Sequence, residues 1–423
     1  MTRHRPFLGA WGATALVVTS MVGTGVFTTA GFQVRDVGDP WTILALWAVG
    51  GVLALCGAVS YAELATAIPR NGAEYALISR IFHPAVGFVA GMVGVFAGFA
   101  GPTAASALAF GSYLGAAAPG VPQVPAAVAL ICGSALVHGW DPSLGRRFQV
   151  AVTAVEIVLV AGFATLGLTA AQVPLVARPV GDAGAIAVAL VYVSYAYSGW
   201  NSAAYVAGEL HDPSRTAPRA LLAGTGLVAV LYVALNAAFL MSAPPAALSG
   251  QVEIGAVAAT AWLGPVGGRI CAALIAWCLS AMVGAMLVTG PRLIAAIGDD
   301  YPALGWLGRR SARGVPVNAL AVQTAIAIGM AVGASFEDLL AWMGVLLAAA
   351  SLVTVAGVPW LRWREPGLER PYRVPFYPLP PLLFGALTTW MVTMSVLEEP
   401  RVGAWAAGIA VAGVGVWLAI RRA

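Results

Sequence analysis

The chain has 423 residues, of which 60% are hydrophobic and only 9% are charged. About 25% of the residues of an ordinary soluble domain are charged, so this composition excludes a soluble globular protein. All 22 basic residues are arginines, and the chain therefore contains no lysine. A Walker-A phosphate loop and a Schiff base with pyridoxal phosphate or retinal each require a lysine. The composition thus excludes an ATP-driven pump, a pyridoxal enzyme and a rhodopsin.

The charged and sulfur-containing residues give no sign of a cofactor, a metal or a nucleic-acid partner. The net charge is +4, but the arginines are spread between apolar runs, which indicates membrane topology rather than nucleic-acid binding. The four cysteines lie in apolar stretches without metal-ligand spacing, and the four histidines are far apart. No pairing of a nucleophile with a base is visible. The sequence therefore predicts neither an enzyme nor a bound cofactor or metal.

Twelve apolar segments follow one another along the chain, and a helix that crosses the hydrocarbon core needs about 20 residues. They are residues 9–32, 40–68, 84–117, 125–139, 148–171, 184–208, 219–242, 257–297, 316–333, 336–361, 379–397 and 402–420. The fourth is short, and the ends of the eighth extend beyond the bilayer. Arg3 and Arg5 precede the first segment as in a signal peptide, but the apolar run continues to Phe32 without a cleavage site. We therefore expect a retained first span.

The distribution of arginines predicts the orientation of these spans. Twelve spans put both termini on the same side of the membrane. Placing the termini in the cytoplasm puts eighteen arginines inside and leaves four outside, namely Arg35, Arg178, Arg269 and Arg401. Cytoplasmic loops are enriched in arginine, so both termini are expected to be cytoplasmic. The loops are too short to build a further domain, and we expect one transmembrane domain over residues 1–423 in the inner (cytoplasmic) membrane.

Two of the spans are weakened by glycine near their middle. The first contains Gly23-Thr24-Gly25, and the sixth contains Ser198-Gly199. Two weakened spans five apart are typical of a transporter built from inverted repeats with broken helices. The alternative is that these glycines only permit close helix packing. Unwound segments bind a zwitterion through free N–H and carbonyl groups, and four nearby aromatic residues are candidates to cover such a site, namely Tyr192, Tyr195, Tyr197 and Trp200.

Acidic residues within the spans are candidates for ion coupling, because charge is costly inside a membrane. Glu156 lies near the middle of the fifth span, nine residues after Arg147, and is the predicted coupling or cation-binding residue. The alternatives are a neutral glutamic acid bonded to the backbone and a span boundary that places Glu156 near the membrane interface. Glu63 lies near the end of the second span and is expected to support loop structure or a cytoplasmic gate. Glu337 and Asp338 begin the tenth span, where negative charge suits a helix N-terminus and no further role is needed.

Several motifs, in this order and spacing, resemble the amino acid/polyamine/organocation superfamily, specifically amino acid permeases related to the L-type exchangers. The resemblance covers nearly the whole chain. The matching stretches are VGTGVF at residues 22–27, YAEL at 61–64, IPRNGAEY at 68–75, YAYSGWN at 195–201, GELHDP at 208–213, PRA at 218–220 and RPYRVP at 370–375.

The resemblance implies a fold of two inverted five-helix repeats, about 7–171 and 184–361, followed by helices eleven and twelve at about 379–420. Transport would proceed by alternating access around a central site. The amides that would bind the substrate carboxylate are those of Gly23, Thr24 and Gly25. The carbonyls that would bind its amine are those of Met21, Tyr195, Ala196 and Ser198. Tyr195 also matches the aromatic gate position, and Asn201 matches a polar residue that lines the site.

Glu156 departs from the family pattern, because many relatives have a lysine at this place in helix five. The inverted charge leaves three roles open: carrying a proton, admitting a cation, or contacting a basic group of the substrate.

The sequence thus predicts a secondary active transporter of amino acids that works as a proton symporter or as an exchanger. A polyamine or cationic-amine permease is the neighbouring alternative. A non-transporting membrane sensor and a membrane-embedded enzyme are alternatives of a different class. The expected partners are a small-molecule substrate, the lipid bilayer and a proton. The sequence does not predict which amino acid is carried or the oligomeric state.

Overall fold

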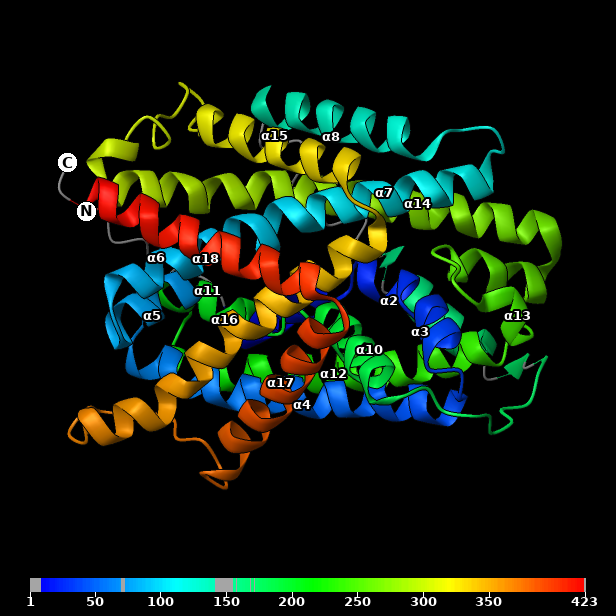
Figure 1. The fold of residues 1–423 in the computed structure, drawn as a ribbon, viewed down its shortest axis with the longest axis horizontal. Helices are drawn as coiled ribbons and strands as arrows, with labels where there is room; N and C mark the ends of the chain where they lie inside the picture. Colours follow the sequence, from blue (N-terminus) through cyan, green and yellow to red (C-terminus); the bar gives the residue numbers. More distant parts are fainter. Residues whose placement is uncertain are drawn as a thin grey trace.

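The computed structural model describes residues 9–69, 73–140, 155–156, 158–167, 169–170 and 172–421. Arg3, Arg5, Arg147 and much of the fifth predicted span lie outside this set. The described residues form helices and no strands, as Figure 1 shows. Nine of their helices are long and apolar enough to cross a membrane, and three shorter apolar helices occupy the remaining places of the twelve predicted spans. The predicted all-α, multi-pass architecture is confirmed.

The first half of the chain contains α1 (Ala10–Met21), α2 (Thr24–Thr28), α3 (Ala30–Asp36), α4 (Pro40–Ala67), α5 (Ala73–Ile81), α6 (Pro84–Val93), a π-helix (Gly94–Ala100), α7 (Gly101–Ala117) and α8 (Gln123–Trp140). A short apolar helix, Val158–Gly167, represents the fifth span. The second half contains α10 (Ala183–Ala196), α11 (Ser202–Tyr205), a 3₁₀ turn (Ala207–Glu209), α12 (Pro213–Leu240), α13 (Pro245–Leu248), α14 (Ile254–Asp300), a 3₁₀ turn (Pro302–Leu304), α15 (Val317–Gly333), α16 (Phe336–Arg364), α17 (Leu379–Glu398) and α18 (Pro400–Ile420).

Local signals in the sequence explain where several helices begin or change. Asp39 caps α4 by accepting a hydrogen bond from the amide of Thr42, and Pro40 occupies the first turn. Ser335 and Asp338 form a reciprocal capping box at the start of α16. The helix α14 is interrupted at Gly264, whose φ of 74° no other residue type adopts easily. The eighth predicted span therefore consists of a short segment before Gly264 and a long membrane helix after it.

The helices form two packed groups (Figure 1). One group contains α1, α4, α10, α11 and α12, in which α12 packs against both α1 and α4. The other contains α7, α8, α14 and α15, in which α14 packs against the other three. The helix α16 contacts α4 and α10 of the first group and α7 of the second. The helix α16 therefore bridges the two groups.

Helices at equivalent positions of the two predicted repeats pack against each other. These pairs are α4 with α12, α7 with α14, and α8 with α15. Such pairing is what a two-fold axis between two inverted repeats produces. The repeat boundaries themselves remain a prediction.

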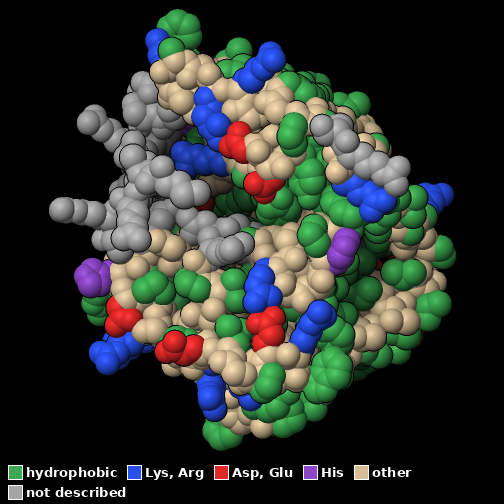
Figure 2. All heavy atoms as spheres, turned by 90° about the vertical axis from the view of Figure 1, so that its left-hand side faces the viewer, with side chains coloured by type: hydrophobic (Ala, Val, Ile, Leu, Met, Phe, Trp, Pro, Cys, Tyr) green, Lys and Arg blue, Asp and Glu red, His purple; other side chains and the backbone are tan. Residues whose placement is uncertain are grey.

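Ion pairs mark one end of the molecule, which we call the charged end and which faces the viewer in Figure 2. Its defining contacts are Arg80–Glu365 at 2.9 Å and Arg310–Asp299 at 2.6 Å. The hydrogen bonds from Arg80 hold the pKa of Glu365 below its usual value. The opposite end contains α13, which packs against α3, and we call it the α13 end.

Candidate functional site

The first span is broken where the glycine motif predicts. The helix α1 ends at Met21, Gly23 is fully extended with φ of −167°, and α2 begins at Thr24. The first amides of a helix have no acceptor within the helix. The break therefore places N–H groups at the start of α2 and carbonyl groups at the end of α1 next to each other in the core.

The sixth span is broken as well. The helix α10 ends at Ala196, and the chain turns through Gly199 before α11 begins at Ser202. The φ of Gly199 is +97°, a conformation that favours glycine. A β-carbon at this position would also lie 2.3 Å from the carbonyl oxygen of Ser20. Glycine is thus required both for the turn and for its contact with the end of α1.

The two breaks meet in the core of the protein. A β-carbon on Gly25 would lie 2.5 Å from the Cα atom of Ala196, so α2 and the end of α10 approach each other with no room for a side chain. The structure therefore brings together the two segments that the sequence predicts to form the substrate site. Most of these residues are buried, namely Met21, Gly23, Thr24, Gly25, Tyr195 and Ala196, and two are half-buried, namely Ser198 and Asn201.

Side chains from other helices hold the first break in place. The Tyr232 hydroxyl of α12 donates a 2.5 Å hydrogen bond to the carbonyl of Met21. The hydroxyls of Thr24 and Ser106 are hydrogen-bonded, which joins α2 to α7. On α14, the Cε atom of Met282 would lie 3.0 Å from a β-carbon on Gly23. None of these three partners is predictable from the sequence, because an isolated polar or flexible residue in an apolar span carries no signal of what it contacts.

The four aromatic residues near the second break have separate contacts. Tyr197 donates a 3.0 Å hydrogen bond to the carbonyl of Trp47. Trp200 packs edge-on against Tyr61, with ring centroids 4.8 Å apart. Tyr192 reaches the α13 end, and Tyr195 is buried beside the break. Of the four, Tyr195 is therefore the one that remains a candidate gate, as the resemblance implies.

Asn201, at the edge of the predicted site, is hydrogen-bonded to a side chain of another helix. Its Nδ2 donates a 2.5 Å hydrogen bond to Oε1 of Glu74 on α5. Glu74 also accepts hydrogen bonds from the hydroxyls of Tyr61 and Tyr205, at 2.8 and 2.5 Å. We call these four residues the Glu74 cluster. Glu74 belongs to the motif IPRNGAEY at residues 68–75, but nothing in the sequence indicates which donors its carboxylate accepts from.

Glu156 is buried, with 5% of its surface exposed. Its neighbours Val155 and Leu159 pack against Cys278 on α14. None of the ion pairs among the described residues includes Glu156. The role of Glu156 in coupling therefore stays a prediction.

An ion pair at the α13 end joins α3 to the start of α16. Arg35 of α3 binds Glu337 at the start of α16, and the Tyr192 hydroxyl lies 3.4 Å from the same carboxylate. The rings of Phe32 and Phe336 stack beneath this pair, with centroids 6.2 Å apart. The prediction that Glu337 needs no role beyond the helix N-terminus is therefore wrong, whereas Asp338 caps the helix as expected.

At the charged end, Glu63 joins α4 to the segment that follows α16. The carboxylate is 2% exposed and accepts hydrogen bonds from Arg362 at 2.6 and 2.9 Å and from the amide of Val374 at 2.7 Å. Arg370 lies 3.5 Å away. The expected role of Glu63 in loop structure is confirmed.

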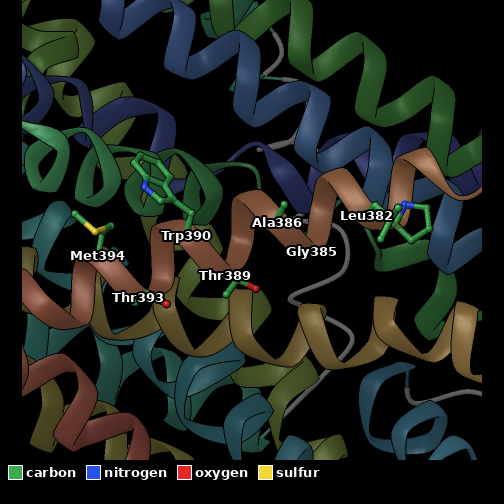
Figure 3. Close-up of a pocket in the computed structure, with 8 residues that line it drawn as sticks. Leu382, Gly385, Ala386, Thr389, Trp390, Thr393 and Met394 are labelled. Atoms are coloured by element: carbon green, nitrogen blue, oxygen red, sulfur yellow. The ribbon is translucent and has the colours of Figure 1, made fainter.

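A groove of about 590 Å³ runs along the outer face of α17 (Figure 3) and does not belong to the breaks. Its lining residues are Pro381, Leu382, Gly385, Ala386, Thr389, Trp390, Thr393 and Met394. None of them is a predicted site residue. Within the described ranges, no three His, Cys, Asp or Glu side chains gather in a group that could hold a metal ion.

Comparison with known proteins points to one family. The family model described as "Amino acid permease" matches residues 8–418. The "Large neutral amino acids transporter small subunit 2" of Mus musculus is 27% identical, over 97% of this chain and 80% of the relative. The "Asc-type amino acid transporter 1" of Mus musculus is 26% identical, over 93% of this chain and 77% of the relative. The "Cystine/glutamate transporter" of Homo sapiens is 25% identical, over 91% of this chain and 79% of the relative.

Proposed function

Because the chain belongs to the amino acid permease family, we propose that it is a secondary active transporter that moves amino acids across a membrane by alternating access. The match confirms the resemblance drawn from the motifs. The chain is a multi-pass membrane protein, and its relatives are transporters rather than enzymes. Each of the three relatives reported above is named as a transporter of amino acids.

The observation that carries this proposal is the contact between the two broken helices. The N–H groups at the start of α2, at Thr24 and Gly25, would bind the substrate carboxylate, helped by the positive end of the helix dipole. The carbonyls of Met21, Tyr195, Ala196 and Ser198 would bind the ammonium. A carbonyl oxygen has two lone pairs, so the Met21 carbonyl can accept from the substrate while it accepts from Tyr232.

These contacts use only the groups that all amino acids share. Such a site needs no buried arginine or lysine, in agreement with a chain that contains no lysine. The preference for particular side chains would then depend on the pocket walls, to which Ser106 and Met282 contribute beside the first break.

We place the charged end in the cytoplasm and both termini on that side of the inner (cytoplasmic) membrane. The eighteen arginines that this orientation puts inside, against four outside, support it. In this orientation Arg35 and Glu337 close the extracellular side, and their ion pair must part before a substrate enters from outside.

Counterflow into proteoliposomes, with a panel of amino acids and polyamines at acidic and neutral pH, tests the function. Uptake restricted to one group of amino acids is the expected result. Uptake restricted to polyamines would favour the alternative in which Glu156 contacts a basic group of the substrate. Absence of uptake for every compound in the panel, from protein that elutes as a single folded species, would refute the transport function.

Glu156→Gln tests whether this buried carboxyl couples transport to protons. The glutamine keeps the size of the side chain but does not titrate. We expect transport by the variant to lose its pH dependence or its ability to accumulate substrate. Exchange without coupling predicts instead that both properties stay unchanged, and this result would exclude the symport role of Glu156.

Gly23→Leu tests the location of the site. A β-carbon at Gly23 meets only the flexible end of Met282, so the fold is expected to tolerate the change. The remainder of the leucine side chain would enter the break and block the substrate. Thermal stabilisation by substrate should therefore disappear while the unliganded variant keeps its melting temperature. Normal substrate affinity would place the site elsewhere.

A further inference from the structure

We propose that Glu74 is a positioning residue for transport, whose carboxylate holds the unwound part of helix six against α4 and α5 and so keeps the charged end closed. This role rests on the proposed transport function. It assigns to one side chain the task of closing the cytoplasmic side of the path.

The geometry of the Glu74 cluster connects three elements. Glu74 lies in the first turn of α5, Tyr61 lies on α4, and both Asn201 and Tyr205 belong to the segment that follows the break in helix six. Oε1 accepts from Tyr61 and Asn201, and Oε2 accepts from Tyr205. Both carboxylate oxygens are therefore occupied by donors that come mostly from helix six.

The charge of Glu74 makes these hydrogen bonds important. The residue is 9% exposed, and none of the ion pairs in the described part of the chain includes it. Its stabilisation in the closed form comes from three neutral donors. A buried carboxylate without donors is strongly unfavourable. The segment after the break in helix six can therefore move away from α5 only if water replaces Asn201 and Tyr205 as donors to the carboxylate. The cluster thus has two stable states, one closed and without water and one open and hydrated.

The cluster also reaches the predicted substrate site. Asn201 follows the turn at Gly199, and three of the four carbonyls proposed to bind the substrate amine, those of Tyr195, Ala196 and Ser198, lie just before that turn. A carboxylate only accepts hydrogen bonds, so the Asn201 amide must direct its nitrogen toward Glu74 and keep its oxygen for other partners. Glu74 thereby fixes both the position of the segment and the orientation of the amide next to the site.

The aromatic packing around the cluster supports the same closure. Tyr61 is fully buried, and its ring packs edge-on against Trp200, the residue before Asn201. The unwound segment is thus held to α4 by a ring contact and to α5 by the carboxylate. Movement of helix six must break both contacts together.

Accessibility of a cysteine at position 202 tests the closure directly. Ser202 lies between Asn201 and Tyr205, and its hydroxyl is buried without a partner. The four native cysteines are replaced by alanine, Ser202→Cys is introduced, and inverted membrane vesicles that expose the charged end are treated with a membrane-impermeant thiol reagent. The rate of modification then reports how often the charged end opens.

We expect Glu74→Gln to raise this rate by about tenfold or more, because its amide NH2 replaces one acceptor oxygen by a donor that faces another donor. The substitution also removes the charge that strengthens the other hydrogen bonds. Tyr205→Phe removes one donor and should raise the rate in the same direction by a smaller factor. Glu365→Gln is the matched control, since that carboxylate lies at the charged end but binds Arg80 on the surface. Its rate should equal that of the parent.

A second readout separates positioning from a general loss of stability. Fewer molecules of Glu74→Gln would have the charged end closed, so the apparent KM for an amino acid added at the α13 end should rise, while kcat per folded molecule is retained. Modification at the parent's rate in both Glu74→Gln and Tyr205→Phe would overturn the proposal. The thiol assay needs no substrate, so it distinguishes failure of this closure from failure of the transport function, which the counterflow panel detects.

Discussion

Glu63→Gln tests the contact between α4 and the segment after α16. The carboxylate is 2% exposed and is held by Arg362, Arg370 and the amide of Val374. The substitution keeps the size of the side chain and removes its charge. Arg362 and Arg370 then lose the buried negative charge with which both are paired.

The expected loss follows from what each arginine retains. Removing one partner of a buried ion pair costs about 3–5 kcal/mol. Arg370 is 6% exposed but still donates to the carbonyls of Leu361, Glu365 and Leu368 at 2.7–3.0 Å. Arg362 is partly exposed and packs over the ring of Tyr377 at 3.8 Å. We therefore expect the lower end of that range, a loss of about 3 kcal/mol in the free energy of unfolding.

Unfolding in detergent micelles, followed by tryptophan fluorescence, measures this loss. Glu365→Gln is the control, because the Arg80–Glu365 pair is exposed and should contribute less than about 1 kcal/mol. The double variant with Arg362→Ala should be less destabilised than the sum of the two single variants. A loss for Glu63→Gln no larger than that of the control would refute the reasoning.

Three further changes probe the breaks and the loops. Gly25→Val should abolish folding or transport, because its β-carbon would lie 2.5 Å from Ala196; normal expression and uptake would contradict the close approach. Tyr232→Phe removes the hydrogen bond that holds the Met21 carbonyl in position. The KM for substrate, measured by counterflow, should therefore rise several-fold with little change in protein yield. Burial acts to raise the pKa of Asp39, but hydrogen bonds from backbone amides, Arg178 first among them, and from the Thr42 hydroxyl lower it. The stabilising effect of the ionised carboxylate is therefore present above pH of about 4 and is lost as the pH falls through the lowered pKa. The free energy of unfolding, measured against pH, should fall less steeply at acidic pH in Asp39→Asn than in the parent.

The sequence was most informative where a local property determines the structure. The second span was predicted at residues 40–68 and is observed as Pro40–Ala67, because apolar length, a capping aspartate and a proline act within a few residues. The break near Gly23 was predictable for the same reason, since glycine weakens a helix wherever it stands.

Contacts between distant residues could not be predicted in this way. The donors to Glu74 lie 13, 127 and 131 residues away in the chain, and only the packed fold brings them to one carboxylate. Glu337 was misjudged because its place at a helix N-terminus already explained its charge. Its partner Arg35 lies 302 residues earlier.

In the proposed mechanism the closures at the two ends use separate residues, Arg35 with Glu337 on one side and the Glu74 cluster on the other. An ion leak through the protein requires both to be open at the same moment. Even if the two ends opened independently, each in about 1 of 100 molecules, both would be open in only about 1 of 10,000, and alternating access makes this state rarer still. The cell could then produce this protein in quantity without discharging its membrane potential.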